Sequence, residues 1–504
     1  MSHQSSAEGE NRRVRIGVIL LGPVLAIAAY LAAPAEFSEA ARGTLLVTVW
    51  TVTWWVTEAI PIPAASLLPA VLLPLMGVCK ASVAAKFYSH HLILLLLGGF
   101  FLAKAVECSG LHRRIALATL TSVGTSPRRL AFGFLITSAM LSMWISNTST
   151  TLMLMPIAIS VARRTAKEMK SGGAAFTTCL LLCTAYGANV GGIGTLIGTP
   201  PNLIFTKNAE ELIPPVNIDF LHWLQFGLPM VIIFIPIIGF LMTRFLLPLA
   251  PGTSTSGRES LLEERRSLGK MSSAEARVLV VFICTALLWM TRGGAGFSGW
   301  SGVVGGWMGM AEGSAHEYLN DSFVALVAGI SLFLIPGKRG GAPLLDWDQA
   351  KEVPWGMLLL FGGGFAIGGA FQQSELSSHF GKWMAQWVDL PFAGIVVTIS
   401  MATTFLTEVT SNTASMHVLM PILKEAALEG GIAPIHMMLP AVLSVSCAFM
   451  LPVATAPNAI VFSTGKVQIR TMIRCGVVLN LVGVLVVLLV TMITQALDWM
   501  PGAT

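Results

Sequence analysis

Charged residues are scarce in this sequence. Asp, Glu, Lys and Arg make up 11% of its 504 residues, whereas soluble domains contain about 25%. Hydrophobic residues account for 54%, and the mean hydropathy is +0.74. Runs such as 16–33, 224–247 and 477–497 reach the ~20 apolar residues that a membrane-spanning helix needs. The composition therefore excludes a soluble globular protein and predicts an all-α polytopic membrane protein without a separate soluble domain.

Residues that would mark a metal centre or an enzyme active site are also lacking. The seven cysteines form no CxxC pair and lie mostly in apolar segments, where cysteine is a small packing residue. Gly192, Gly194 and Gly198 follow no strand, so they do not indicate a dinucleotide-binding loop. No converging set of His, Asp and Glu points to a membrane enzyme. The sequence thus predicts no enzyme activity, no organic cofactor and no nucleic-acid partner, with the lipid bilayer as surroundings.

Basic residues cluster in alternate connections between the apolar runs. The clusters lie at 1–15, 112–129, 163–170, 258–277, 338–351 and 466–474. The intervening connections are acidic or nearly neutral, so the positive-inside rule places the basic set in the cytoplasm. We therefore expect a protein of the cell (inner) membrane with a cytoplasmic tail at 1–15 and an uncleaved first helix. About eleven crossings would leave the C-terminus outside.

The tripeptide Ser-Asn-Thr occurs at 146–148 and again at 411–413, 265 positions later. Neighbouring residues match at the same offset, for example Ser142 with Thr407. One constant offset over such a stretch indicates two related halves. Their predicted boundaries are 16–248 for the first half, 249–277 for a cytoplasmic linker and 278–504 for the second half.

Each tripeptide lies in an apolar region that begins and ends on the same side of the membrane. Such a region must enter and return as a re-entrant hairpin, and the two hairpins enter from opposite faces. Proline and glycine then interrupt the following span in each half and free backbone carbonyls. The predicted fold is thus about eleven transmembrane helices plus two re-entrant hairpins in an inverted repeat, which is typical of secondary transporters. The predicted hairpins are 130–161 and 392–423, and the broken helices are 177–205 and 436–463.

Both hairpins place small polar groups in an apolar environment. Hydroxyls, an amide and freed carbonyls suit a hard cation such as Na⁺, whereas amide NH₂ groups and helix N-termini suit a carboxylate. A single tripeptide could reflect helix packing alone, but duplication in matched surroundings favours an ion and solute site. Glu58, Glu408 and His417 also lie in or beside apolar runs. None has a counterpart in the other half, so their roles stay open.

Five motifs stand out together: Trp54–Pro61, the two Ser-Asn-Thr tripeptides, Ile197–Asn202 and Phe449–Asn458. With them the chain resembles the divalent anion/sodium symporter (DASS) family, which contains bacterial and animal dicarboxylate and citrate transporters. The resemblance covers essentially the whole chain. It implies a homodimer, a scaffold and a moving transport part in each protomer, elevator-like alternating access and Na⁺-coupled uptake. Ala456 is a departure, because many relatives have proline there, and we expect it to loosen the substrate-side loop.

The resemblance also implies roles for individual residues. One sodium site would be formed by Ser142, Ser146, Asn147 and Gly194. A pseudo-symmetric second sodium site would be formed by Thr407, Thr410, Asn412 and Ala454. Substrate carboxylates would be held by Asn147, Thr148, Asn412 and Thr413, with Thr195 and Thr455 nearby. Since no arginine is matched between the halves, bound Na⁺ would offset the charge of the substrate, which gives a physical reason for coupling.

The preferred interpretation is Na⁺-coupled symport of a small dianion of the C4-dicarboxylate class, such as succinate, malate or fumarate. Sulfate-type relatives often carry large soluble inserts between the halves, and this chain has only a short linker, which favours carboxylates. Citrate or sulfate symport with Na⁺, and Na⁺-independent dicarboxylate exchange, remain alternatives. A channel would need a continuous polar path, and two broken hairpins favour an occluded central site instead.

Overall fold

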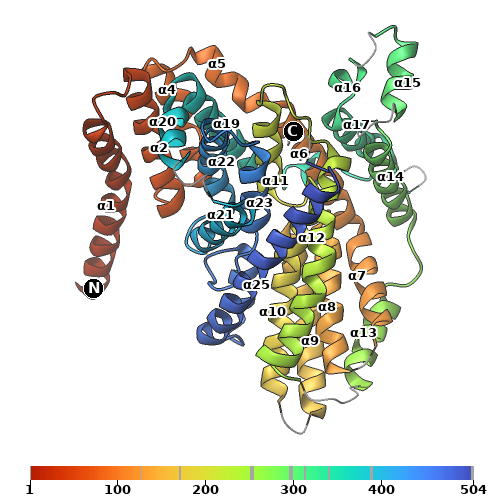
Figure 1. The fold of residues 1–504 in the computed structure, drawn as a ribbon. Helices are drawn as coiled ribbons and strands as arrows, with labels where there is room; N and C mark the ends of the chain where they lie inside the picture. The colour runs from red at the N-terminus through yellow and green to blue at the C-terminus, as the bar shows by residue number, and fades with distance from the viewer. Residues whose placement is uncertain are drawn as a thin grey trace.

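The computed structural model of this protein contains helices and connecting segments (Figure 1). It describes residues 2–124, 126–169, 172–249, 255–293, 299–310, 314–338, 341–385 and 390–500. Over these ranges the only β-type pairing is one isolated bridge between Pro336 and Pro343. The predicted all-α class is confirmed.

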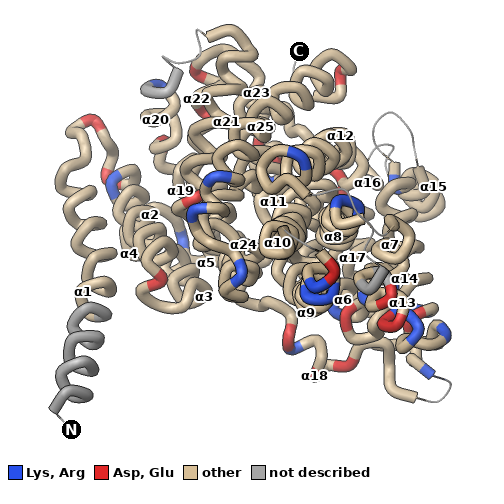
Figure 2. The backbone as a smooth tube through the Cα atoms, turned by 90° about the horizontal axis from the view of Figure 1, so that it is seen from below, with Lys and Arg blue, Asp and Glu red and all other residues tan. Residues whose placement is uncertain are grey.

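Six helices of the described residues are long and apolar enough to cross a membrane. They are Ala81–Ser109, Gly173–Gly194, Phe220–Leu246, Ser273–Met290, Trp355–Gln373 and Ile469–Ala496. Shorter apolar helices occur at Ile16–Ala32, Ile62–Leu75, Asp321–Leu334, Phe392–Thr407 and Ile435–Val445. In Figure 2 most of the tube is tan, and charged residues gather near connections such as those around α13. The polytopic class is confirmed, while the number of about eleven crossings stays a prediction.

The chain begins with helices that precede the first hairpin. They are α1 (Ser2–Ala32), α2 (Glu39–Thr57), α3 (Ile62–Ala65), α4 (Leu68–Leu75), α5 (Ala81–Lys86), η1 (Phe87–Ser89), α6 (His91–Ser109) and α7 (Leu111–Ser122). Helix α1 stands at the edge of the molecule and packs against α2 (Figure 1). Residues 2–15 of the predicted tail form the beginning of α1, and their side chains lie outside the described part.

The first repeat unit follows as two helices and a broken helix. The two helices are α8 (Pro127–Ser142) and α9 (Asn147–Glu168), separated at 143–146 inside the predicted hairpin. The broken helix consists of α10 (Gly173–Gly191), the short η2 (Gly192–Gly194) and α11 (Pro200–Glu210). Helix α12 (Phe220–Leu241) then runs into the π-helical turn η3 (Met242–Leu246).

The linker that the sequence analysis placed at 249–277 contains a helix, α13 (Thr255–Ser267). Helix α13 packs on α7 and α9, and two ion pairs hold it there: Arg113–Glu264 at 2.7 Å and Arg164–Glu263 at 2.9 Å. The linker is therefore docked along the first hairpin rather than extended.

The second half repeats the order of the first. Its leading helices are α14 (Ser273–Met290), α15 (Gly299–Trp307), α16 (Ala315–Tyr318), α17 (Asp321–Leu334), α18 (Trp347–Ala350), α19 (Trp355–Gln373) and α20 (Leu376–Ala385). The hairpin helices α21 (Phe392–Thr407) and α22 (Asn412–Glu429) are separated at 408–411. A broken helix of α23 (Ile435–Val445) and α24 (Ala456–Ser463) precedes α25 (Ile469–Ala496).

The two repeat units interlock. Helix α11 of the first unit packs against α22 and α23 of the second, and α24 of the second packs against α9 and α10 of the first. Figure 1 shows α11 near α22 and α23 in the middle of the molecule, with α9 and α10 extending below them. The interlocking brings the non-helical breaks of both units into the same buried region.

Candidate functional site

The tip of the first hairpin is shaped by short polar residues at the helix ends. Ser142 ends α8 and Asn147 begins α9, and the Ser142 hydroxyl donates a hydrogen bond of 2.6 Å to Asn147 Oδ1. Ser146 caps α9, because the Ser149 backbone N–H donates to its hydroxyl at 3.2 Å. An N-cap hydroxyl satisfies one of the free N–H groups at a helix start. Thr148, in the first turn of α9, is exposed.

The break in the first broken helix lies directly against this tip. A Cβ atom on Gly192 would lie 2.6 Å from Asn147 Oδ1 and 3.2 Å from Thr199 Cβ, so a side chain there would displace Asn147. The Thr195 hydroxyl donates to the carbonyl of Met143, at the hairpin tip. Among the predicted residues, Ser142, Asn147 and Thr195 are thus brought together by these contacts.

Asn202 organises the carbonyl groups of this break. Its Nδ2 donates to the carbonyls of Thr195 (2.7 Å) and Gly192 (3.1 Å). The side chain is fully buried, and its Oδ1 atom has no hydrogen-bond partner among the described residues. An uncommitted buried amide oxygen beside freed carbonyls and hydroxyls is a donor set that fits a hard cation such as Na⁺.

The second hairpin repeats this arrangement. The Thr407 hydroxyl donates to Asn412 Oδ1, as Ser142 does to Asn147. The Thr410 hydroxyl lies 2.7 Å from the Ser415 hydroxyl, and Thr413 of α22 is buried. The matched pairs at both tips show that the repeat extends from the sequence to the hydrogen bonds.

The breaks also correspond, but with a different offset. Asn458 Nδ2 donates to the carbonyls of Ala448 (3.0 Å) and Leu451 (3.1 Å), as Asn202 does to Gly192 and Thr195. Asn458 lies 256 positions after Asn202, and its two carbonyl partners lie 256 positions after those of Asn202. By this offset, Thr455 corresponds to Thr199 and not to Thr195. Thr199, which our sequence analysis did not select, therefore joins the candidate residues. The shared Thr-x-Pro-Asn pattern at 199–202 and 455–458 was the signal for it.

Asn189 of α10 connects the two breaks. Its Nδ2 lies 3.1 Å from the Thr455 hydroxyl, 3.2 Å from Asn458 Oδ1 and 3.3 Å from the Ala448 carbonyl. The two amide hydrogens are shared among these three acceptors. Through Asn189, the first repeat unit reaches the part of the second that contains Ala454 and Thr455, both in the segment between α23 and α24.

The side chain of Glu408 links the second hairpin to its broken helix by hydrogen bonds. Its Oε1 accepts hydrogen bonds from the backbone N–H of Phe449 (2.8 Å) and Met450 (2.9 Å) and from Asn480 Nδ2 (2.7 Å). Its Oε2 accepts one from the N–H of Leu451 at 3.0 Å. The residue is 2% exposed. A carboxylate with four donors is held in place and leaves little capacity for a mobile ion.

The other two ionisable candidates lie elsewhere. His417 of α22 packs among the rings of Phe361, Phe365 and Trp55, and only a glycine at 364 leaves room for its imidazole. Glu58 lines a cavity of about 650 Å³ with Thr57 and Pro61, to which neither hairpin contributes. The ring contacts give His417 a packing role. Glu58 lines a cavity that does not include the hairpin tips.

Two cavities with both polar and apolar walls adjoin the first hairpin. One of about 290 Å³ is lined by Ile145, Ser149 and Thr150 of the hairpin and by Glu107 and His112. The other, of about 760 Å³, is lined by residues of α9, which include Arg163 and Arg164, and by residues of α24, which include Ile460. Cationic side chains that line a cavity attract anions.

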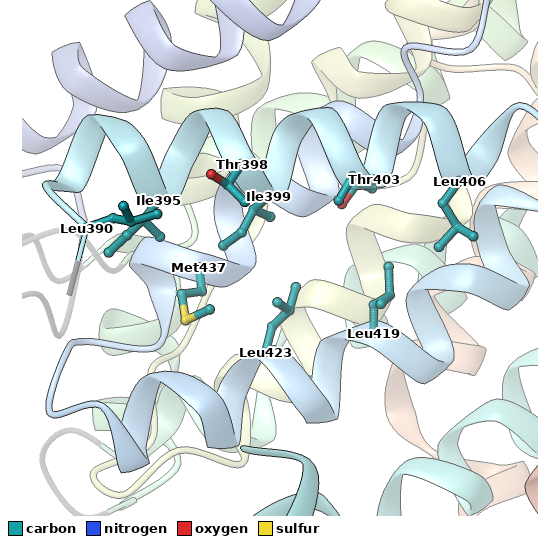
Figure 3. Close-up of a pocket in the computed structure, with 10 residues that line it drawn as sticks. Leu390, Ile395, Thr398, Ile399, Thr403, Leu406, Leu419, Leu423 and Met437 are labelled. Carbon is teal, nitrogen blue, oxygen red and sulfur yellow. The ribbon is translucent and has the colours of Figure 1, made fainter. Parts of the chain in front are cut away.

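A third cavity is apolar and does not suit a dianion. It has a volume of about 210 Å³ and lies between α21, α22 and α23 (Figure 3). Its walls are formed by Leu390, Ile395, Thr398, Ile399, Ala402, Thr403, Leu406, Leu419, Leu423 and Met437. Burying a charged group against such walls without partners is unfavourable.

The repeat units differ in the helices beside this cavity. Helix α10 has 19 residues and α23 has 11, and the residues 173–178, which include the buried Phe176, have no counterpart in α23. Phe134, which corresponds to Ile399 at the hairpin offset, is fully buried.

Ile399→Phe is expected to stabilise the protein, because the larger side chain would fill part of the apolar cavity that Ile399 lines. Cavity-filling changes commonly contribute about 0.5–2 kcal/mol. The midpoint of thermal unfolding in detergent should rise for Ile399→Phe and stay unchanged for Ile283→Phe, a control on the exposed face of α14. A lower midpoint for Ile399→Phe would contradict this account of the cavity.

Comparison with known proteins places the chain in a family. A family model described as the sodium:sulfate symporter transmembrane region matches residues 14–500. The chain belongs to this symporter family. The family resemblance seen in the motifs is thereby confirmed, and the chain is a multi-pass membrane protein of this family.

Individual relatives of this symporter-family chain cover nearly its whole length. The sodium-dependent dicarboxylate transporter SdcS of Staphylococcus saprophyticus is 35% identical over 497 residues, 96% of this chain and 93% of that protein. SdcS of Staphylococcus aureus strain USA300 is 35% identical over 484 residues, 94% of this chain and 89% of that protein.

Solved structures of two transporters share the fold. The Alcanivorax borkumensis YdaH transporter has a TM-score of 0.60 at 15% identity, with 91% of this chain and 99% of that chain covered. Neisseria gonorrhoeae MtrF has a TM-score of 0.59 at 13% identity, with 95% and 94% covered. At these identities the likeness supports the all-helical transporter fold and nothing finer.

Proposed function

We propose that this symporter-family chain is a secondary transporter that couples Na⁺ to the uptake of C4-dicarboxylates such as succinate, malate and fumarate. The observation that carries the proposal is the matched pair of hairpin tips, Ser142–Asn147 and Thr407–Asn412, each next to a helix break. The names of the SdcS relatives support sodium dependence and the dicarboxylate class.

The chemistry of the tips supports two kinds of ligand. Carbonyl, amide and hydroxyl oxygens around Asn147 and Gly192 would coordinate Na⁺, with Ser146 and Gly194 in the same segments. Thr407, Thr410, Asn412 and Ala454 would provide the second cation site. The N-termini of α9 and α22, which begin at the two asparagines, would hold substrate carboxylates with Thr148 and Thr413.

The coupling of Na⁺ to the substrate would follow from the negative charge of the bound dianion. The described residues that form these tips contain no arginine or lysine, so a bound dianion would depend on nearby Na⁺ for neutralisation. Sodium binding would therefore come first and raise the affinity for the anion, and by linkage the anion would raise the affinity for Na⁺.

The larger architecture is also a proposal. The hairpins would be re-entrant and would enter from opposite faces, with a cytoplasmic N-terminus and an outside C-terminus. The hairpins and broken helices would move together as an elevator against the remaining helices, in a homodimer. The interlocking of α11 with α22 and of α24 with α9 supports a single moving unit.

A substrate panel in liposomes tests the proposal. Purified protein should take up succinate in Na⁺ medium, and citrate and sulfate should be transported more slowly. Faster uptake of citrate or sulfate would reassign the substrate. Succinate uptake that is unchanged when Na⁺ is removed would identify a dicarboxylate exchanger instead.

The arginine-lined cavity gives a further prediction. Arg163→Glu is expected to slow transport of subsaturating succinate from the side on which α9 ends by about tenfold or more, because the reversed charge repels the dianion from the cavity. The effect should shrink as ionic strength rises, since salt screens exposed charges. Lys167→Glu, the same charge change on α9 outside this cavity, is the control. Equal loss in both variants, or no salt dependence, would contradict a steering role for Arg163.

A further inference from the structure

A group of metal-ligating side chains lies apart from the hairpin tips. His90, His91 and Glu210 each offer one ligand atom, and these three atoms lie within 4.8 Å of one another. His91 Nε2 and Glu210 Oε2 are 3.1 Å apart. Tetrahedral zinc with bonds of ~2.1 Å holds its ligand atoms about 3.4 Å apart, so the ligand atoms would have to approach one another by up to about 1.4 Å. His90 Nδ1 also accepts a long hydrogen bond of 3.4 Å from the Leu92 backbone N–H, which metal binding through this atom would replace.

The hydrogen bonds of His91 favour a cation at Nε2. The Ser322 hydroxyl gives its one proton to the His91 carbonyl at 2.7 Å, so at the 3.4 Å contact with His91 Nδ1 it must accept. The Nδ1 atom therefore carries a proton, and in a neutral imidazole Nε2 presents a lone pair toward the Glu210 carboxylate. A metal-ligating histidine usually donates its other ring N–H in this way.

The charges around Glu210 leave its carboxylate available. Neighbouring Glu211 is paired with Lys207 at 2.5 Å and with Lys424 at 3.3 Å, so these lysines are neutralised in part by a different acid. His91 and Glu210 are 40% and 25% exposed in their side chains and line a cavity of about 450 Å³. A fourth ligand, such as water, can reach the group from that cavity.

We propose that His90, His91 and Glu210 form a binding site for a divalent transition metal, with Zn²⁺ as the best fit. Two imidazole nitrogens and one carboxylate oxygen with an open fourth position are a common zinc ligand set. Ser322 is a positioning residue that fixes the tautomer of His91.

The site would join two parts of the protein. Histidines 90 and 91 stand at the start of α6, which packs with α14 and α17, whereas Glu210 ends α11, which packs with α22 and α23. Helix α11 begins with the Thr-Pro-Pro-Asn segment of the candidate transport site. If α11 moves against α6 during transport, as the proposed function requires, bound Zn²⁺ would hold the two together and inhibit.

Metal binding is tested on purified protein, without transport. After loading with ZnCl₂ and dialysis, wild type should retain one zinc ion per chain by elemental mass spectrometry. His91→Ala and Glu210→Gln should lose it, and Ser322→Ala should weaken the affinity by about 10–100-fold. His379→Gln, which removes a histidine elsewhere, should bind like wild type.

Two results would contradict the proposed zinc site. No retained zinc in wild type, or equal retention in monodisperse His91→Ala, would overturn the site and leave His91–Glu210 as an ion pair only. In liposomes in which succinate uptake has first been established, ZnCl₂ should slow uptake by wild type, and EDTA should restore the rate. Uptake by His91→Ala should be unchanged by ZnCl₂. Zinc binding without any inhibition would overturn the bridging role alone, and the proposed transport function would be unaffected.

Discussion

Asn147→Ala and Asn412→Ala are each expected to abolish Na⁺-dependent succinate uptake while leaving the protein folded. Each change removes the amide oxygen that accepts the hydrogen bond of Ser142 or Thr407 at a hairpin tip, and with it a proposed Na⁺ and carboxylate contact. Hydrogen bonds to charged groups contribute about 1.5–3 kcal/mol, which corresponds to a loss of at least tenfold in affinity. Initial uptake rates in liposomes, at several Na⁺ concentrations, provide the measurement.

The matched control is Asn217→Ala, an exposed asparagine in the connection before α12. It should transport like wild type. Size-exclusion profiles and unfolding midpoints of all three variants should match wild type, so that loss of uptake reports the site. Normal uptake by either hairpin variant would contradict a site built from both tripeptides.

Glu408→Gln is expected to eliminate uptake and to lower thermal stability, although the change is nearly isosteric. The carboxylate accepts four hydrogen bonds through two oxygens, and glutamine has one oxygen and a donor in place of the other. At least one buried N–H of 449–451 would then face an N–H₂ group and lose its partner, at a cost of about 1–3 kcal/mol. Thermal unfolding in detergent and Na⁺-dependent uptake are the two readouts.

Glu58→Gln is the matched control, because Glu58 was the other acidic candidate and lines a cavity away from the hairpins. It should have little effect on either readout. If Glu408→Gln keeps its stability and shifts only the Na⁺ or pH dependence of uptake, Glu408 would bind the coupling ion. The interpretation of Glu408 as a structural link would then be wrong.

Local breaks were the part of the fold that the sequence predicted best. Proline, glycine and capping hydroxyls act on their own segment, so the separations between α8 and α9 and between α21 and α22 fall inside the predicted hairpins. The interlocking of the two units could not be predicted, because it depends on which helices pack together over more than two hundred residues.

At the hairpin tips, the hydrogen bonds of Ser142 with Asn147 and of Thr407 with Asn412 join residues that the family resemblance had already grouped. Their roles in binding stay predictions. Thr199 was not selected, although 199–202 and 455–458 share the Thr-x-Pro-Asn pattern. The offset changes from 265 to 256 after the hairpin tips, where α22 and α23 are both shorter than α9 and α10. The partners of Glu408 lie 41 to 72 residues away in the chain, and no periodicity links them. The zinc ligands likewise combine residues from α11 and the start of α6.

Concentrative uptake of succinate driven by a Na⁺ gradient tests the central claim most directly. Liposomes containing the purified protein are loaded with Na⁺-free buffer and diluted into NaCl or KCl medium with labelled succinate. Coupling predicts that internal succinate rises above the external concentration in NaCl and does not accumulate in KCl or after an ionophore dissipates the Na⁺ gradient. Equal accumulation in NaCl and KCl would contradict the account.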